Sequence, residues 1–156
     1  MSSQALRLFQ RYGTSVPGRW LVSRAICFRA PYFASIRPMI DVLEPGRCVV
    51  RIRDRRRVHN HIGTVHAIAL CNMAELAAGL ATDATIPDAL RWIPKGMTVR
   101  YLKKATGAMT ATARVPAIAE AGAGSEVHTL VEVRNAAGEV VFDADITMWI
   151  SPRKAG

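Results

Sequence analysis

The chain has 156 residues, half of them hydrophobic, which suffices for one domain with a buried core and no disulfide staples. Its 21 lysines and arginines outnumber 12 aspartates and glutamates, and the net charge of +9 favours an anionic partner such as a phosphorylated small molecule. Aromatic residues make up only 6% and none stud a basic strand, which argues against nucleic acid as that partner.

The first 35 residues predict helices rather than a targeting signal. Arginines recur through them, and no unbroken apolar stretch of signal-peptide length occurs. We expect amphipathic helices near residues 3–12 and 18–28 that pack against the domain or a dimer partner, with binding to a membrane surface as the open alternative. Residues 1–35 are interpreted as a helical extension and residues 36–156 as the main part of a single domain.

The next elements are two strands and a long helix. Residues 38–43 predict a short strand, closed by a Glu-Pro-Gly turn. Residues 47–55 alternate between apolar side chains and arginines, which indicates a half-buried strand with a basic outer face. After a polar loop at residues 59–64, residues 65–82 are apolar on nearly every side, as in a buried helix.

Four strands follow this helix. They are expected at residues 97–102, 109–115, 126–134 and 140–150. A hairpin turn at residues 135–138 joins the last two, with Gly138 suited to a positive φ. A loop of small residues is expected at 120–125. No run of about 18 apolar residues occurs, so we expect no membrane span.

This order of elements predicts an α+β protein with an antiparallel sheet wrapped around one long buried helix, which is the hotdog fold. A single sheet cannot cover such a helix on every side, so a second copy of the chain is the simplest cover. We therefore expect a homodimer, with a dimer of dimers left open. Cys27, Cys48 and Cys71 form no C-x-x-C pair, which favours three reduced, buried thiols in a cytoplasmic protein.

Glu75 is the residue that most invites a functional interpretation. A carboxylate in the middle of a buried helix is expected to be partnered, to have a raised pKa, or to line a cavity. His66 precedes it by nine residues, which on a helix is about 2.5 turns and about 13 Å. The two side chains cannot meet within one subunit. Either they are unrelated, or a dimer brings them together.

The start of the helix offers further groups. Backbone N–H donors near His66 and Ala67 suit a thioester oxygen as it becomes an oxyanion. Asn60 and His66 are candidates to orient the carbonyl or the attacking water, and Glu75 is the candidate general base or nucleophile. His59, His61 and His66 have no carboxylate or cysteine at ligand spacing, so we expect no metal.

The segment RRRVHNHIGTVHAIALCNMAELAAGL resembles the Asn…His-Gly-Gly…Asp/Glu signature of phenylacetic-acid-degradation-type hotdog thioesterases. With PYFASI upstream it resembles the bacterial domain of unknown function 4442 family more closely. The resemblance implies an acyl-CoA thioesterase without a cofactor, in which coenzyme A is part of the substrate. It assigns catalysis to Glu75, Asn60, His66 and the N–H of Ala67. It also implies substrate contacts for Gly63 and Ile68. Ala67 and Ile68 stand where the family's signature has Gly-Gly after the histidine, and their larger side chains are expected to narrow the acyl channel.

Coenzyme A also requires cations for its phosphates. Arg100, Lys103 and Lys104 at the end of a strand are candidates, as are residues 53–57; a solvated basic rim is the alternative for each. Two other functions stay open. A hydroxyacyl-thioester dehydratase or hydratase pairs a His with a Glu across a dimer, and the spacing of His61 and Glu75 resembles that pattern. The third hypothesis is a non-catalytic acyl-CoA-binding protein on the same fold.

Overall fold

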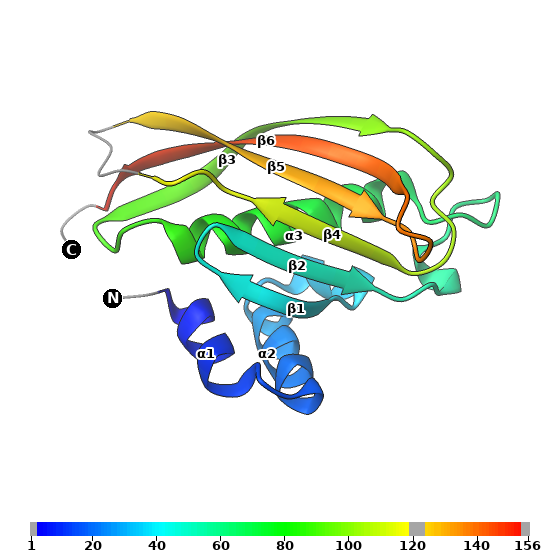
Figure 1. Cartoon of the computed structure of the whole chain (residues 1–156), viewed down its shortest axis with the longest axis horizontal. Coiled ribbons are helices and arrows are strands. Elements are labelled where there is room, and N and C mark those ends of the chain that lie inside the picture. Colours follow the sequence, from blue (N-terminus) through cyan, green and yellow to red (C-terminus); the bar gives the residue numbers. More distant parts are fainter. Residues whose placement is uncertain (1–2, 119–123, 154–156) are drawn as a thin grey trace.

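The computed structural model describes residues 3–118 and 124–153. Its helices and strands are α1 (Gln4–Tyr12), α2 (Val16–Arg29), η1 (Pro31–Ile36), β1 (Met39–Glu44), β2 (Arg47–Ile52), η2 (Arg56–Val58), α3 (Ala67–Thr85), β3 (Leu90–Tyr101), β4 (Met109–Arg114), β5 (Ser125–Arg134) and β6 (Val140–Pro152). The strands form one antiparallel sheet in the order β1-β2-β4-β5-β6-β3. Helix α3 lies across one face of this sheet, as Figure 1 shows, so the predicted hotdog fold is confirmed.

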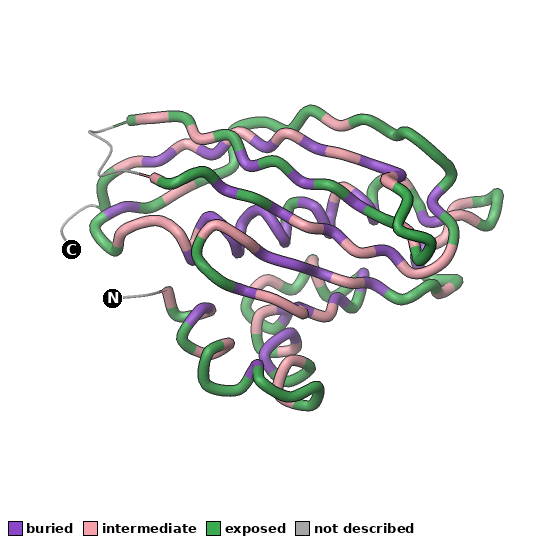
Figure 2. Tube along the Cα trace, viewed as in Figure 1, coloured by how far each residue is buried: buried purple, intermediate pink, exposed green. Residues whose placement is uncertain are grey.

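The core lies between the sheet and α3. Strands β4, β5 and β6 alternate between buried and less buried residues, as their sequences predict (Figure 2). Phe142, Met109 and Ile146 are among the fully buried side chains on the sheet. The side of α3 that meets them is rich in alanine, including Ala74, Ala77, Ala78 and Ala81. Such small side chains let the helix backbone approach the sheet closely.

The two N-terminal helices pack beside β1 and α3 (Figure 1). The hydroxyl oxygens of Ser3 and Ser15 accept hydrogen bonds from the first turns of α1 and α2, and Pro17 occupies the first turn of α2. These are typical helix-start signals, and they explain why the chain folds into helices here. The predicted pair of helices is thus confirmed, with α2 starting two residues earlier than expected.

Three of the boundaries that differ from the predictions have a clear structural reason. Strand β3 begins at Leu90 rather than at residue 97, because an edge strand tolerates Pro94 and a bulge between Pro94 and Gly96. Strand β2 ends at Ile52 rather than at residue 55, because Ile52 pairs with Met109, the first residue of β4. Helix α3 begins at Ala67 rather than at Val65, whose N–H instead donates to the carbonyl of Ala105.

Other predictions concern the loops and thiols. Gly138 has a φ of 81° in the β5–β6 turn, as predicted. Part of the small-residue loop lies at residues 119–123, outside the described residues. All three cysteines are free, and Cys71 is only partly buried. In the two described ranges, no helix has the length and hydropathy needed to cross a bilayer.

Candidate active site

The loop before α3 is organised by Asn60. Its Oδ1 accepts hydrogen bonds of 3.1 Å from the N–H groups of Ile62 and Thr64, and its Nδ2 donates to Thr64 Oγ1 at 2.8 Å. Gly63 has a φ of 79°, which the turn requires. Both polar ends of Asn60 therefore hold the loop that delivers the chain to the start of α3, and Gly63 lets that loop turn.

His66 is the N-cap of α3. Its Nδ1 accepts a hydrogen bond of 3.0 Å from the N–H of Ile68. An acceptor Nδ1 carries no proton, so in the neutral ring the proton is on Nε2, which is a donor. The N–H of His66 is occupied by the carbonyl of Val58, so the expectation of a free donor there is wrong. The N–H of Ala67 has no acceptor among the described residues, so it is an available donor at this helix end.

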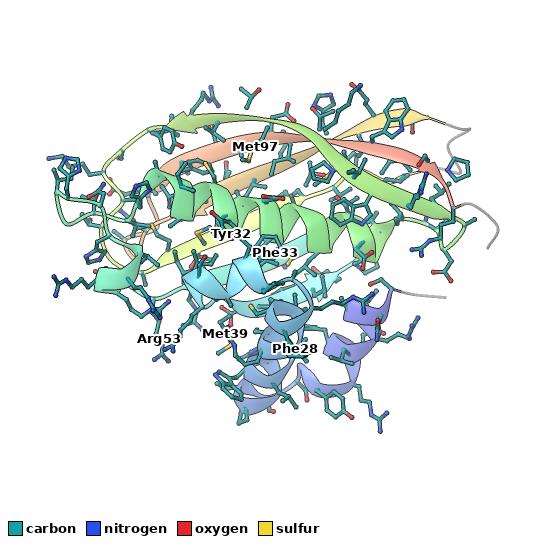
Figure 3. The ribbon with its side chains drawn as sticks, turned by 180° about the vertical axis from the view of Figure 1, so that it is seen from behind. Phe28, Tyr32, Phe33, Met39, Arg53 and Met97 are labelled. Carbon is teal, nitrogen blue, oxygen red and sulfur yellow. The ribbon has the colours of Figure 1, made fainter. Side chains whose placement is uncertain are left out.

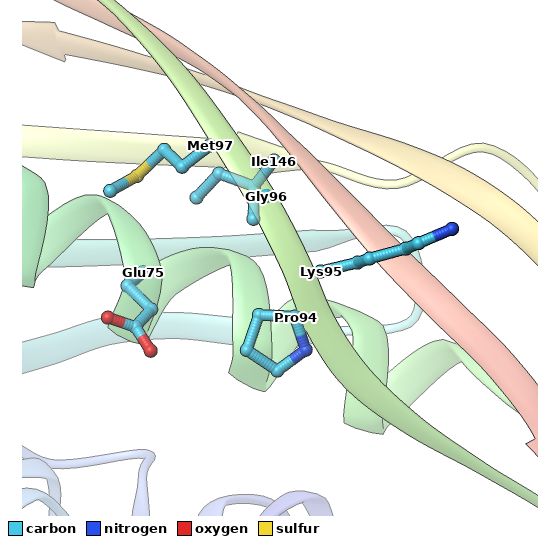
Figure 4. Close-up of a pocket in the computed structure, with 6 residues that line it drawn as sticks. All are labelled: Glu75, Pro94, Lys95, Gly96, Met97 and Ile146. Carbon is cyan, nitrogen blue, oxygen red and sulfur yellow. The ribbon is translucent and has the colours of Figure 1, made fainter.

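Glu75 is exposed, so the expectation of a buried carboxylate is wrong for the single chain. The sequence of α3 is apolar all round, but one of its faces is left open by the sheet and carries Ile68, Cys71 and Glu75. Glu75 borders a cavity of about 260 Å³ between α3 and β3. Figure 4 shows its carboxylate projecting from α3 near Pro94 and Met97 of β3. The expectation that Glu75 lines a cavity is thereby confirmed.

A second, larger cavity of about 880 Å³ also reaches Glu75. It lies between α3 and the N-terminal helices, and its walls include Ile26, Phe33 and Trp92. None of these residues stands out in the sequence, because the periodicity of a helix or strand indicates an apolar face without saying what lies opposite.

The open face continues from α3 onto β3. Ile68, Met97 and Tyr101 are large hydrophobic residues that are 54%, 40% and 51% exposed. In Figure 3, Tyr32 and Phe33 lie on one side of α3 and Met97 on the other, so this face runs between them. Cys71 Sγ and the Tyr101 hydroxyl are 3.3 Å apart. This hydrogen bond, together with burial, raises the pKa of Tyr101 to about 12.

The other histidines of the loop do not converge on His66. His59 Nε2 pairs with Asp54, and His61 is exposed. Within residues 3–118 and 124–153, no group of three or more His, Cys, Asp and Glu side chains is arranged to hold a metal ion. For the chemistry of a thioester, the described residues offer the carboxylate of Glu75, the imidazole N–H of His66 and the backbone N–H of Ala67.

The predicted phosphate ligands at the end of β3 and just after it are partly engaged in ion pairs. Arg100 forms two hydrogen bonds with Asp143, of 2.8 and 2.7 Å, and Lys103 forms an ion pair of 2.7 Å with Glu139. Lys104 is exposed and has no partner among the described residues. Arg100 and Lys103 would have to exchange these carboxylates for a phosphate, whereas Lys104 would not.

A denser group of cations lies around Arg55, just before the Asn60 loop. Burial and the neighbouring guanidinium groups hold the pKa of Arg55 below its usual range; these neighbours are Arg37, Arg57, Arg24 and Arg53. We call these five residues the arginine cluster. Arg37 has the left-handed φ of 46°, and the carbonyls beside it accept from Arg55 and Arg24. Two members of the arginine cluster, Arg24 and Arg55, are thus fixed to the backbone on either side of Arg37.

An antiparallel sheet around a central helix, with a carboxylate of that helix at a cavity of ligand size, defines a hotdog-fold protein of the thioesterase-like class. The family model described as Domain of unknown function (DUF4442) matches residues 18–150, and the chain belongs to this family. The resemblance noted in the sequence is thereby confirmed. No match was found among curated proteins.

Solved structures share this fold over most of the chain. The crystal structure called genomics APC5556 is 43% identical with a TM-score of 0.82, and the match covers 96% of this chain and 98% of the other. A Pseudomonas aeruginosa protein of unknown function, PA5026, named a probable thioesterase, is 26% identical with a TM-score of 0.73, covering 81% and 91%. The thioesterase HI1161 from Haemophilus influenzae is 12% identical with a TM-score of 0.70, covering 80% and 85%, and shows the fold alone.

Proposed function

We propose that the protein is an acyl-CoA thioesterase whose active site forms between two copies of the chain. The observation that carries this proposal is Glu75, an exposed carboxylate in the middle of a largely buried helix, where it lines two cavities. A carboxylate at a ligand-sized cavity is suited to act as general base on water. The thioesterase name of the P. aeruginosa relative supports the same reaction.

In this reaction Glu75 takes a proton from a water molecule whose oxygen attacks the thioester carbonyl carbon. The carbonyl oxygen becomes an oxyanion, which the free N–H of Ala67 at a helix start stabilises, with His66 Nε2–H orienting the carbonyl. Collapse of the intermediate breaks the carbon–sulfur bond, and the sulfur leaves with the electron pair and takes up a proton. The products are a carboxylic acid and coenzyme A. Direct attack by the Glu75 carboxylate, followed by hydrolysis, is the alternative route.

The dimer is needed because His66 and Glu75 lie about 13 Å apart along the same helix. A two-fold axis beside residues 70 and 71 makes two copies of α3 antiparallel and sets His66 against the partner's Glu75. The exposed Ile68, Met97 and Tyr101 support this arrangement, since exposed apolar side chains on one face indicate an interaction surface. For the phosphates of coenzyme A, the arginine cluster and Lys104 offer guanidinium and ammonium groups beyond the pairs formed by Arg100 and Lys103.

The test is hydrolysis of a panel of acyl-CoA thioesters, with acyl groups from short to long and aryl, by wild type and by Glu75→Gln. We expect turnover by the wild type and a loss of about 10²-fold or more in kcat for Glu75→Gln, as removal of a general base produces. Glu132→Gln is the matched control, because Glu132 is exposed on β5 and pairs with Arg134 instead of lining either cavity. This control should hydrolyse the panel at the wild-type rate.

Three results would contradict the proposal. Full activity of Glu75→Gln would show that Glu75 is not the general base. Tight binding of acyl-CoA without turnover by the wild type favours a non-catalytic binding protein, and addition of water to an enoyl-CoA favours a hydratase. Size-exclusion chromatography with light scattering measures the molar mass in solution and so tests the dimer independently of activity.

A further inference from the structure

The larger cavity is a groove between α3 and the N-terminal helices, and it starts at Glu75. Eleven of its nineteen lining residues are apolar, alanine, glycine and proline included. Its volume of about 880 Å³ falls within the usual range for small-molecule sites. The groove therefore has the size and lining of a site for an apolar ligand that also reaches the candidate base.

The floor of the groove is a straight stripe of α3. It consists of Glu75, Leu76, Gly79, Leu80 and Asp83, which recur at the spacing of one helical turn. From Glu75 to Asp83 the stripe rises about 12 Å along the helix axis. The groove thus has a carboxylate at each end of its floor and apolar side chains between them.

One wall is the indole of Trp92, which lies directly on Gly79. A Cβ at position 79 would come within 2.8 Å of Trp92 Cη2, so only glycine lets the ring lie this close to the helix. Trp92 Nε1 also approaches Asp83 Oδ1, at 3.4 Å, which fixes the ring's edge. The other wall is formed by the N-terminal helices and η1, whose apolar lining residues include Leu8, Ala25, Ile26 and Phe33 and whose polar ones include Arg29.

The far end of the groove is polar. Arg7, Asp88 and Arg153 line it together with Asp83. Hydrocarbon is stabilised beside the apolar middle but gains nothing beside charged groups, so the apolar part of a ligand is expected to end there. The groove is thus bounded by Glu75 at one end and by charge at the other.

We infer that this groove binds the acyl chain of the substrate, and that α1 and α2 set its length. This inference rests on the proposed thioesterase activity. An extended chain advances about 1.2 Å per bond, since a peptide residue spans about 3.5 Å with three bonds. The floor of about 12 Å therefore accommodates an unbranched acyl chain of about ten carbons. The pantetheine arm, with two amides, is excluded from the apolar middle by the cost of desolvating them.

The test is to fill the groove from the outside. Ala25 is exposed on α2 and lines the groove, so Ala25→Trp adds an indole there without disturbing the core. We expect kcat/KM for decanoyl-CoA to fall at least tenfold, while kcat/KM for butanoyl-CoA stays within about twofold, because a four-carbon chain covers only about 4 Å of the floor of about 12 Å. Leu21→Trp is the matched control: it places the same side chain one turn earlier on α2, exposed and outside the groove, and should leave both values unchanged.

A second variant tests the opposite change. Ile26→Ala enlarges the groove and should shift the preferred chain length upward, toward dodecanoyl-CoA and tetradecanoyl-CoA. If Ala25→Trp slows decanoyl-CoA and butanoyl-CoA equally, or slows neither, the groove does not hold the acyl chain although the thioesterase proposal stands. If the wild type hydrolyses no thioester, that proposal fails. Calorimetric binding of decanoyl-CoA then decides: weaker binding to Ala25→Trp supports the groove, and equal binding overturns it.

Discussion

His66 shows how one side chain combines a structural and a chemical role. Its Nδ1 accepts the N–H of Ile68 and so caps α3, which leaves the Nε2–H directed away from the helix as a donor. The ring is exposed, so this donor is available to a ligand. A histidine held in this tautomer is suited to orient a carbonyl and not to act as a base.

Two substitutions separate these roles. His66→Ala removes the cap and should lower the free energy of unfolding by about 1 kcal/mol. His66→Asn should retain most of that stability, because asparagine is a preferred N-cap. Both lose the Nε2–H, so we expect kcat/KM for acyl-CoA to fall at least tenfold in each. Urea denaturation and hydrolysis rates provide the two measurements. Wild-type activity in a stable His66→Asn would show that the ring does not contact the substrate.

The sequence identified the candidate residues, but it did not predict their exposure or their hydrogen-bond partners. Glu75 stands out because it is the carboxylate in the middle of an apolar segment, whatever the fold. Its exposure was not predictable, since that depends on which face of α3 the sheet leaves open. The local role of Asn60 was likewise hidden, because an Asx-type turn depends on the loop's geometry and not on spacing to His66.

One edge strand of the sheet is covered by a helix and the other is exposed. Helix α2 covers the β1 edge: Ser23 Oγ accepts the N–H of Ile40 at 2.9 Å and donates to the carbonyl of Arg19. Ser23 is fully buried. At the opposite edge, β3 is exposed along nearly its whole length. An exposed edge strand offers unpaired N–H and C=O groups to another chain, so β3 is the edge where a partner can add.

The closure of the β1 edge can be tested with Ser23→Ala. This change leaves the buried N–H of Ile40 without an acceptor and should lower the free energy of unfolding by about 1–3 kcal/mol. Ser151→Ala is the control, because Ser151 Oγ accepts a hydrogen bond from Arg91 at the exposed surface. It should change stability by no more than about 0.5 kcal/mol. Equal stability of the two variants in guanidinium would mean that water replaces Ser23 and that α2 does not seal this edge.

Strands whose apolar and polar residues alternate regularly were predictable from the sequence. A strand whose alternation is interrupted was not. The alternation in β4, β5 and β6 reflects one buried face, so the sequence pattern and the structure agree there. The first half of β3 was missed because Pro94 and Gly96 normally argue against a strand. Proline is compatible with this position because β3 pairs with β6 on one side and with no strand of the described residues on the other.

The whole molecule leaves its central helix only partly covered. The sheet buries one side of α3 and the N-terminal helices flank another, while Ile68, Cys71 and Glu75 stay on the open side. The sequence predicted that one sheet would not suffice, but a single chain cannot show how a second copy is placed. The geometry of α3 limits the choices, because only an antiparallel pair of helices brings His66 near the partner's Glu75.

A composite site makes a prediction about heterodimers that a site within one chain does not. Two heterodimers, isolated with different affinity tags on their two chains, carry the same pair of substitutions in different arrangements. The first joins a His66→Ala chain to a Glu75→Gln chain. In a composite site this leaves one site with both native residues, so the heterodimer should show about half of the wild-type activity.

The second heterodimer carries His66→Ala and Glu75→Gln on one chain and pairs it with a wild-type chain. Here each composite site lacks one of the two residues, so hydrolysis should fall to the level of the single-variant homodimers. Sites confined to single chains would reverse this order, because the wild-type chain would then keep a whole site and half of the activity. Comparing the two hydrolysis rates at equal heterodimer concentration therefore tells whether His66 acts with Glu75 of its own chain or with the partner's Glu75.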